Sequence, residues 1–391
     1  MAKPRKPEAA PTLERLFAAK EIVIHCGSGG VGKTTTAAAA ATMAAIHQGG
    51  RVLVLTVDPA RRLANALGIE RFGNVETRVP DAAFAAAGVE PRGELWAAML
   101  DTKQGWDDLI KRHAPDEKTR DAILANPLYQ NLMNRFVQSH DYVAMERLYE
   151  LHSSGTYDLI VVDTPPTRNA IDFLEAPARM ADFFSSRLLR WLTAPARSRV
   201  VNFASKPFYT VADRILGTQF LQDISEFFLL MQGMYGGFVE RAQAVEKVLH
   251  DRRTTFVVVS TLESAPVREA EFFIEELRTR KLHLGALVLN KVLPSSLLDR
   301  KATTTARMLE DKAAGVAAAV AEPLQAEPEQ LARVLKEVGT SFLNFQVVAQ
   351  REAETRAEMA AVPEVVASVP YFDSDIYDLS GLVRLGAAIW R

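Results

Sequence analysis

The segment GSGGVGKT at residues 27–34 constrains this chain more than any other stretch, because it fits the pattern G-x-x-x-x-G-K-[ST] without a mismatch. Small residues let successive backbone N–H groups face phosphate oxygens, and the start of the following helix adds positive potential. In such a loop Lys33 contacts the β- and γ-phosphates, and Thr34 offers its hydroxyl to Mg²⁺. A strand-like run precedes the segment and an alanine-rich helical run follows it, which argues against a glycine-rich turn that matches by chance. The segment therefore predicts a phosphate-binding loop.

Near-continuous apolar runs without alternation indicate strands that are buried on both faces of a parallel sheet. Segments of helical periodicity separate these runs, as a crossover architecture requires. The fold class expected is α/β: a P-loop NTPase with a mostly parallel β-sheet flanked by helices, plus an inserted helical subdomain. The runs are at 21–26, 51–58, 157–164, 254–260 and 284–292.

The domain organisation expected is a flexible tail at 1–19, followed by one nucleotide-binding domain over 20–391. Two stretches, at about 94–155 and 175–250, have mainly helical patterns and predict the inserted subdomain. A third helical region, 303–358, is rich in alanine and glutamate and predicts a solvated layer.

Composition narrows the function classes. The 391 residues carry a formal net charge of −2, and the basic pairs are too few for a nucleic-acid-binding stripe, so no nucleic acid is expected as a partner. No apolar run is long enough to span a membrane, and the charged, proline-rich start does not resemble a signal peptide. The single cysteine, Cys26, excludes an intrachain disulfide, a CxxC metal site and a cysteine-ligated cluster built from this chain alone, and it is expected in the core. A cytoplasmic location fits best.

Two aspartates end strand-like runs. Asp163 is expected near Mg²⁺, directly or through water, and Asp58 is expected to orient or deprotonate the attacking water. For both, the alternative is a helix cap or turn residue, which is the ordinary role of an aspartate at the end of a strand.

Four segments, GSGGVGKTT, LTVDPARRL, VVDTPPTRNAIDFLEAP and VLNKVLP, occur in the order seen in the ArsA-type ATPases. The sequence resembles this family over about 20–300, most closely its bacterial anion-transporting branch. The family includes the arsenite-pump ATPase and the ATPase that delivers tail-anchored membrane proteins. The resemblance implies an ATPase that uses ATP and Mg²⁺ and works as a dimer.

The resemblance also implies roles for individual positions. Asp58 matches the aspartate that positions the hydrolytic water, residues 163–167 match the segment that senses the γ-phosphate, and Asn290 matches the asparagine that recognises adenine. Pro370 and Phe372 match the segment that closes over the base. The residues implied to hold the phosphates are Gly29, Gly30, Val31, Gly32, Lys33, Thr34 and Thr35, with Thr34 on Mg²⁺.

Ser28 departs from the family's motif G-K-G-G-x-G-K-[ST], whose first lysine reaches the partner's phosphates across a dimer. Such finger cations contribute about 10³ to 10⁵ in rate in related enzymes. Three accounts are open: Arg61, Arg62 or Arg168 substitutes for the lysine, hydrolysis is slow, or a lysine-bearing paralogue supplies it. We slightly favour the heterodimer over a homodimer.

Two further departures limit what carries over from the family. The sequence PTRNA at 166–170 replaces the P-T-G-H-T of better-known members, so a role for that histidine is in doubt. The cysteines that bind zinc or arsenite in those members are missing, which disfavours a metalloid pump subunit.

The apolar segments within 180–240, such as EFFLLMQGMYGGF, allow two interpretations. They form an adaptable groove for an apolar client, or they pack the subdomain core or a dimer seam, which is the more common role of such residues. The function predicted is Mg²⁺-dependent ATP hydrolysis that couples nucleotide state to capture or release of a protein or membrane-associated partner. The alternatives are a nucleotide-gated chaperone or scaffold with little hydrolysis, and a ParA- or MinD-like spatial regulator.

Overall fold

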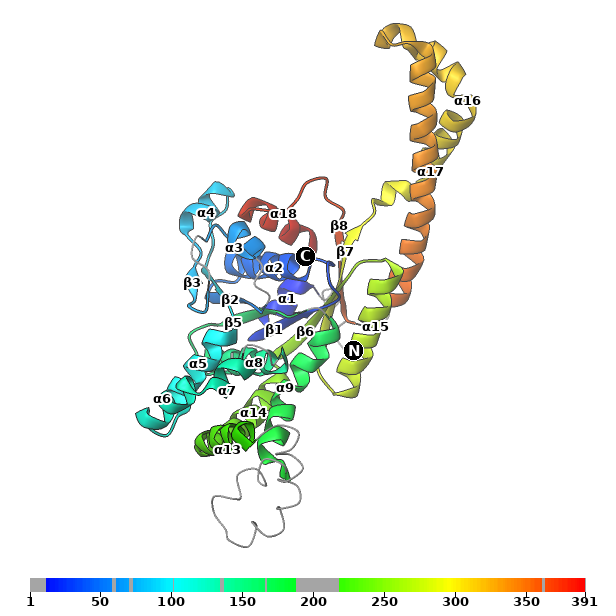
Figure 1. Cartoon of the computed structure of the whole chain (residues 1–391). Coiled ribbons are helices and arrows are strands. Elements are labelled where there is room, and N and C mark those ends of the chain that lie inside the picture. Colours follow the sequence, from blue (N-terminus) through cyan, green and yellow to red (C-terminus); the bar gives the residue numbers. More distant parts are fainter. Residues whose placement is uncertain are drawn as a thin grey trace, which may run out of the picture.

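A computed structural model describes residues 12–57, 61–69, 73–100, 102–133, 137–165, 167–187, 218–360 and 363–390. Its centre is an eight-stranded sheet in the order β3-β4-β2-β5-β1-β6-β7-β8 (Figure 1). All neighbouring strands are parallel except β3, which is antiparallel to β4. The strands are β1 (Ile22–Cys26), β2 (Arg51–Thr56), β3 (Thr77–Arg78), β4 (Glu94–Met99), β5 (Leu159–Asp163), β6 (Thr254–Ser260), β7 (Leu284–Val292) and β8 (Val365–Pro370). The predicted fold class, a mostly parallel sheet flanked by helices, is confirmed.

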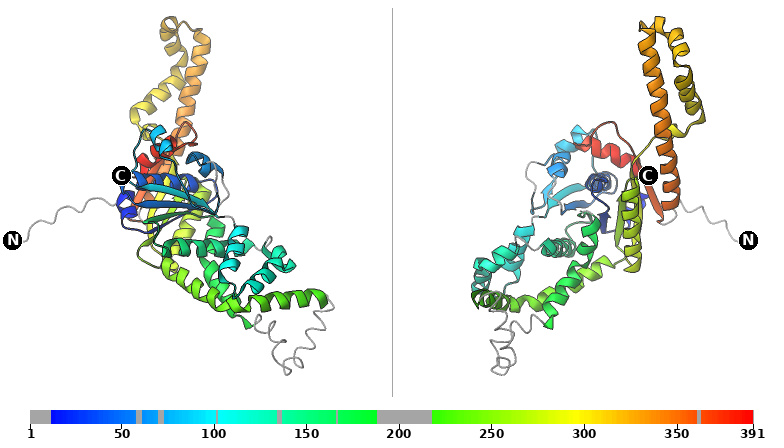
Figure 2. Two further views of the ribbon diagram at one scale, coloured as in Figure 1. Left: turned by 90° about the vertical axis from the view of Figure 1, so that its left-hand side faces the viewer. Right: turned by 45° about the vertical axis from the view of Figure 1, so that its right-hand side comes forward.

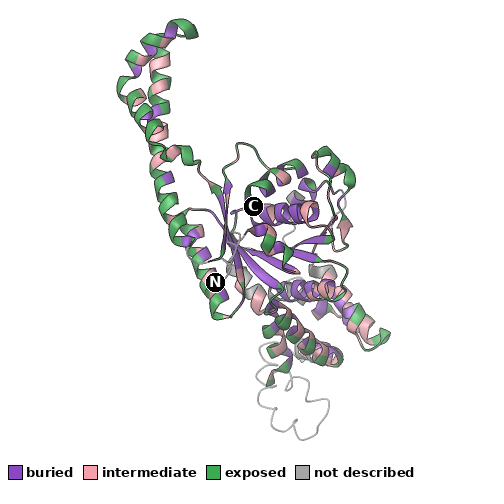
Figure 3. Ribbon diagram, turned by 180° about the vertical axis from the view of Figure 1, so that it is seen from behind, coloured by how far each residue is buried: buried purple, intermediate pink, exposed green. Residues whose placement is uncertain are grey.

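Helices cover both faces of the sheet, and the strand side chains alternate between two apolar cores. Val23 of β1 faces one core, while its neighbours Ile22 and Ile24 face the other. The first core is built largely on α2 (Lys33–His47), whose alanines let the helix lie close to the strands, and on α18 (Leu379–Ile389). The second core packs the sheet against α8 (Val137–Ser153), α14 (Tyr235–Leu249) and α15 (Ser264–Thr279). The central strands are buried throughout (Figure 3). Short helices α3 (Arg61–Ala66) and α4 (Asp81–Ala86) lie on the first side.

A separate group of helices lies beyond one end of the sheet (Figure 1). It has its own aromatic core, in which Phe184 stacks on Phe238 with ring centroids 4.6 Å apart. Phe227, Met231 and Met234 are also buried there, so these apolar residues of the 175–250 stretch pack a core. The helices are α5 (Thr102–His113), α6 (Glu117–Ala125), α7 (Pro127–Met133), α8, α9 (Thr167–Ser185), α13 (Thr218–Met231), the 3₁₀ turn η2 (Gln232–Met234) and α14.

Three expectations differ from the structure. Residues 13–18 of the expected tail form helix α1 (Leu13–Ala18), because Leu13 and Phe17 bury their side chains in the first core. Residues 94–99, expected to begin a helical stretch, form β4, which pairs with β2 along its whole length. The expected solvated layer is a hairpin of α16 (Arg300–Leu324) and α17 (Pro328–Met359), preceded by the 3₁₀ turn η3 (Ser295–Leu298), and it projects from the body (Figure 2).

Within the described ranges, no helix combines the length and the apolar character needed to cross a bilayer.

Candidate functional site

The loop between β1 and α2 has the backbone that phosphate binding needs. Gly30 and Gly32 have φ of 79° and 94°, a left-handed region that favours glycine. A side chain at Gly27 would place its Cβ 2.1 Å from the carbonyl oxygen of Val259, so the start of the loop admits only glycine. Gly29 and Gly30 are exposed, and α2 begins at Lys33, so the N-terminal turn of the helix follows the exposed part of the loop. Thr35 lies half-buried in that same turn.

Lys33 is held against the loop that precedes it. Its side chain is 7% exposed, and its Nζ donates a hydrogen bond of 2.9 Å to the carbonyl oxygen of Ser28. The Ser28 hydroxyl is buried and has no hydrogen-bond partner among the described residues. The ammonium group of Lys33 therefore lies against the loop, and its contact with phosphates stays a prediction.

The hydroxyl of Thr34 donates to Asp163 Oδ2 at 2.6 Å, which joins the loop to the end of β5. A second hydroxyl, that of Thr56 at the end of β2, donates to the same oxygen at 3.0 Å. Asp163 is 1% exposed and Thr56 is fully buried, so the hydrogen bond between these two residues is shielded from water. Thr56, which lies within the apolar run at 51–58, was not identified from the sequence.

A Thr hydroxyl and a carboxylate are the hard oxygen ligands that Mg²⁺ prefers, and one or two such groups plus phosphates are its usual protein environment. Because Thr34 donates its proton to Asp163, its remaining lone pairs are available to a cation. The residues present thus fit the predicted Mg²⁺ site.

Asp58 and Pro166 lie outside the described residues, and so do the side chains of Arg61, Arg62 and Arg168. The last described residue before Asp58, Val57, donates its backbone N–H to the carbonyl oxygen of Asp163 at 3.2 Å. Val57 therefore lies beside the end of β5.

Asn290 lies at the carboxyl end of β7, against the phosphate loop. Its Nδ2 donates to the carbonyl oxygen of Val31 at 2.7 Å, and a Cβ at Gly32 would lie 2.3 Å from that nitrogen. Next to it, Lys291 brings its Nζ within 3.5 Å of the carbonyl oxygen of Gly30. Lys291 was not singled out in the sequence.

The segment after β8 lies beside this strand end. The N–H of Tyr371 donates to the carbonyl oxygen of Val292 at 2.9 Å, and the Phe372 ring lies under the guanidinium of Arg384, 4.9 Å from its centroid. The structure therefore brings Pro370 and Phe372, from the last part of the chain, next to the strand end that carries Asn290.

Cys26, at the end of β1, is buried in the second core, as predicted. Burial raises the pKa of its thiol to about 12, so the group is neutral at physiological pH. Its neighbour His25 is also buried, which lowers the pKa of the imidazole to about 3. The His25 carbonyl accepts the Thr164 hydroxyl at 2.8 Å and thereby joins β1 to the residue after Asp163.

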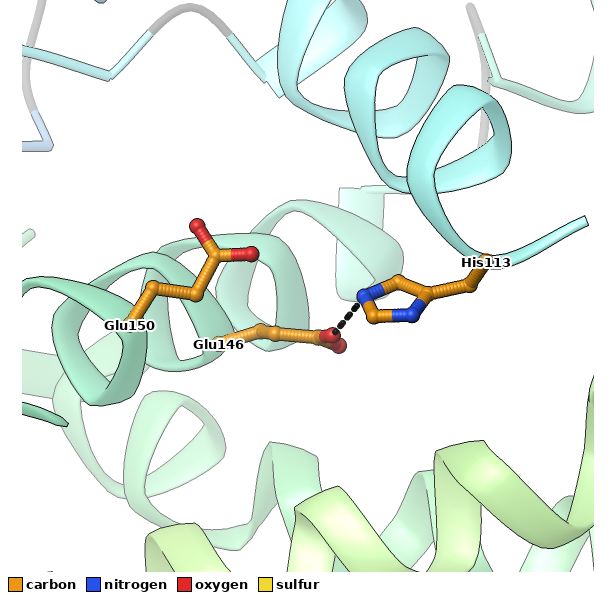
Figure 4. A group of neighbouring side chains, drawn as sticks. All are labelled: His113, Glu146 and Glu150. Carbon is orange, nitrogen blue, oxygen red and sulfur yellow. Dashed lines mark ion pairs between the residues drawn. The ribbon is translucent and has the colours of Figure 1, made fainter. Parts of the chain in front are cut away.

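A second polar cluster lies between α5 and α8, where His113, Glu146 and Glu150 place their ligand-type atoms within 4.8 Å of one another (Figure 4). His113 Nε2 is 3.7 Å from Glu146 Oε1. Glu146 also forms an ion pair with Arg241, and Glu150 accepts from Arg112 and from Arg147. The arginines already balance the carboxylates, so this cluster ties the helices together.

Curated proteins from several organisms are similar in sequence to this chain. An ATPase ASNA1 homolog of Entamoeba dispar is 25% identical over 68% of this chain and 75% of its own length. ATPase GET3 of Podospora anserina is 24% identical over 77% of this chain and 83% of its own. An uncharacterized protein of Streptomyces coelicolor, SCO2128, is 31% identical over 68% of this chain and 61% of its own. The family model described as anion-transporting ATPase matches residues 20–317.

Proposed function

The chain belongs to the anion-transporting ATPase family and is an ATPase, and we propose that it binds ATP on the loop at 27–34 and hydrolyses it with Mg²⁺. The observation that carries this proposal is the hydrogen bond from Thr34 to Asp163. It joins the start of α2 to the end of a neighbouring buried strand, so a hydroxyl and a carboxylate meet at the N-terminal turn of the helix.

Each residue of the site has a distinct task in this proposal. The N–H groups of residues 29–35 and the Lys33 ammonium bind the triphosphate and neutralise charge that develops on it. Thr34 and Asp163 hold Mg²⁺, which when bound supplies further charge neutralisation at the phosphate oxygens. Asp58 orients the attacking water; the residue that precedes it, Val57, hydrogen-bonds to the backbone of Asp163.

The base site is formed by Asn290 together with the segment 370–372. The Asn290 amide already contacts Val31 of the loop, so the group that reads adenine is fixed relative to the groups that bind phosphate. The segment at 370–372 lies next to the same strand end and would close over the base.

Helix α9 offers a physical route from the nucleotide to the helical group. It begins at Thr167, four residues after Asp163, and its second half carries Ala176 and Phe184 into the aromatic core. A change at the γ-phosphate that moves residues 163–167 would therefore shift a helix that is packed in that core. We propose that the helical group captures or releases an apolar protein or a membrane-associated partner in this way.

The proposal also includes a dimer that closes across the phosphate loops. We place this dimer in the cytoplasm. Ser28 supplies no cation, so either another group of this chain or a lysine-bearing paralogue has to do so. Among these options we slightly favour the paralogue, because Ser28 stands where the family's motif has its first lysine.

Steady-state ATP turnover tests the proposal, with three samples: the chain alone, the Ser28→Lys variant, and the chain with a lysine-bearing paralogue. Turnover that rises by about 10³ or more with the paralogue or with Ser28→Lys supports a missing finger cation. Full turnover by the chain alone, unchanged by Ser28→Lys, contradicts the heterodimer and places the cation in this chain. ATP binding without turnover in every sample would favour a nucleotide-gated scaffold, the reading that Ser28 supports.

A further inference from the structure

Lys291 has a backbone conformation that its side chain does not favour. Its φ is 60°, in the left-handed region that costs a non-glycine residue energy, and its own N–H donates to Asn290 Oδ1 at 2.9 Å. Such a conformation persists only where the surrounding structure enforces it, and these positions concentrate at functional sites. The hydrogen bond to Asn290 orients the neighbouring amide so that its nitrogen faces Val31.

The strand is also irregular at this point. The pairing of β7 with β8 shifts register between Leu289 and Val292, and Lys291 lies within that shift. In a regular strand, neighbouring side chains point to opposite faces of the sheet. Here Asn290 and Lys291 both contact the phosphate loop, on the carbonyl oxygens of the adjacent residues Val31 and Gly30. Register shifts of this kind next to active sites re-aim a side chain.

The path of the Lys291 side chain explains what this arrangement does. It starts beside Asn290, where the base is proposed to bind, and its ammonium group ends at Gly30, at the exposed top of the phosphate loop. The four methylene groups therefore run between the base end and the phosphate end of the site. Lys291 is exposed, so a bound ligand can cover its stem.

We propose that Lys291 is a nucleotide-positioning residue, whose methylene stem packs along the nucleoside of bound ATP while Gly30 anchors its ammonium group. This inference rests on the proposed function, because it places the nucleoside beside Asn290. The ligand class is a purine nucleoside triphosphate, and the contact concerns the nucleoside, not the phosphates.

Equilibrium binding to the purified full chain tests the proposal, with Mg²⁺ present and with ATP and inorganic triphosphate as separate probes. Lys291→Ala is expected to raise the dissociation constant of ATP about tenfold, which corresponds to about two buried methylene groups. The dissociation constant of inorganic triphosphate is expected to stay within about twofold of the wild-type value. Lys291→Met keeps most of the stem but lacks the ammonium group, so it should weaken ATP binding about threefold. Lys291→Arg keeps both a stem and a charged group and should bind ATP with wild-type affinity.

Lys281 provides a matched control. It is also an exposed lysine with a left-handed backbone, at φ 57°, but it precedes the amino end of β7 and so lies at the opposite end of that strand from Asn290. Lys281→Ala should leave both affinities unchanged.

Two results would overturn the assignment of Lys291. If Lys291→Ala leaves the affinity for ATP unchanged, the stem of Lys291 does not contact the nucleoside. If the variant weakens the binding of ATP and of triphosphate equally, Lys291 only supports the loop. Failure of the wild-type chain to bind either probe contradicts the proposed function itself, which distinguishes that failure from an error about Lys291.

Discussion

Replacing Thr56 by valine is expected to lower the affinity of the enzyme for Mg²⁺, because Thr56 donates a hydrogen bond to the carboxylate that is proposed to hold the metal. Its hydroxyl donates to Asp163 Oδ2 at 3.0 Å, the same oxygen that accepts from Thr34 at 2.6 Å. Valine keeps the shape of threonine and suits a strand, so β2 should retain its pairing with its neighbours. The substitution therefore removes one donor from a buried carboxylate and little else.

The magnitude follows from the burial of the pair. A hydrogen bond to a charged group contributes about 1.5–3 kcal/mol, and neither Thr56 nor Asp163 is open to water that could replace it. The free energy of unfolding should fall by about that amount. Loss of an outer-sphere partner of a metal-binding group typically costs about 10- to 100-fold in metal affinity, so the half-saturating Mg²⁺ concentration should rise by that factor.

Thr56→Ser is the matched control, because it keeps the hydroxyl and loses one buried methyl group. It should cost about 1 kcal/mol in stability and leave the Mg²⁺ requirement close to that of the wild type. Turnover is measured against Mg²⁺ concentration at saturating ATP, and stability by urea denaturation. A Mg²⁺ requirement that is the same in Thr56→Val and Thr56→Ser would refute the idea that Thr56 orients Asp163.

Three further outcomes are expected. Asp58→Ala should abolish turnover but retain ATP binding, and turnover at the wild-type rate would exclude Asp58 as the residue that handles water. Gly32→Ala should impair folding and ATP binding, because its Cβ would lie 2.3 Å from an amide nitrogen at a φ of 94°, whereas Gly29→Ala meets nothing within 4 Å and should fold with wild-type stability. Arg241→Met should destabilise the fold by about 3–5 kcal/mol at neutral pH, because it leaves the buried Glu146 carboxylate without its guanidinium partner. Burial already raises the pKa of Glu146, and removal of Arg241 raises it further, so Glu146 binds a proton more readily in the folded variant. The loss in the free energy of unfolding should therefore shrink as the pH falls through that pKa. A loss that does not change with pH between 4 and about 8 would contradict this.

The sheet could be predicted where its strands consist of branched apolar residues. The runs that became β1, β5 and β6 are buried along their whole length, which is why they lack alternation. Strand β4, with the sequence ELWAAM, has no β-branched residue, and its alanines and leucine suit a helix equally well. Its conformation depends on pairing with β2, a contact between distant parts of the chain that local pattern does not contain.

Helix α1 was not predicted, and the helices at 303–358 were predicted as a solvated layer and not as a projecting hairpin, for a related reason. Helix α1 is a short segment next to the charged N-terminal residues, and it is stabilised because Leu13 and Phe17 are buried in a core that distant elements build. In the hairpin, the small residues of α16 and α17 pack on each other: a Cβ at Gly339 would lie 2.6 Å from the Ala306 carbonyl. The helical pattern was readable in the sequence, but the partner of each helix was not.

At the site, residues that belong to a contiguous motif were predictable, and residues that arrive through the fold were not. Lys33 and Thr34 are fixed by the loop pattern, and Asp163 by its position at the end of an apolar run. Thr56 gains its role from the register of β2 against β5, which places it directly opposite Asp163. Lys291 gains its role from a left-handed residue within a register shift, a conformation that the sequence of a strand gives no sign of.

The central claim is that ATP and Mg²⁺ bind on the loop at 27–34 through Lys33 and Thr34. Calorimetric titration of ATP into the purified chain with Mg²⁺, beside Lys33→Ala and Thr34→Val, tests it most directly. The account predicts that the wild type binds ATP, that Lys33→Ala loses binding, and that Thr34→Val binds ATP but gains nothing from added Mg²⁺. Equal ATP affinity in the wild type and Lys33→Ala would contradict it.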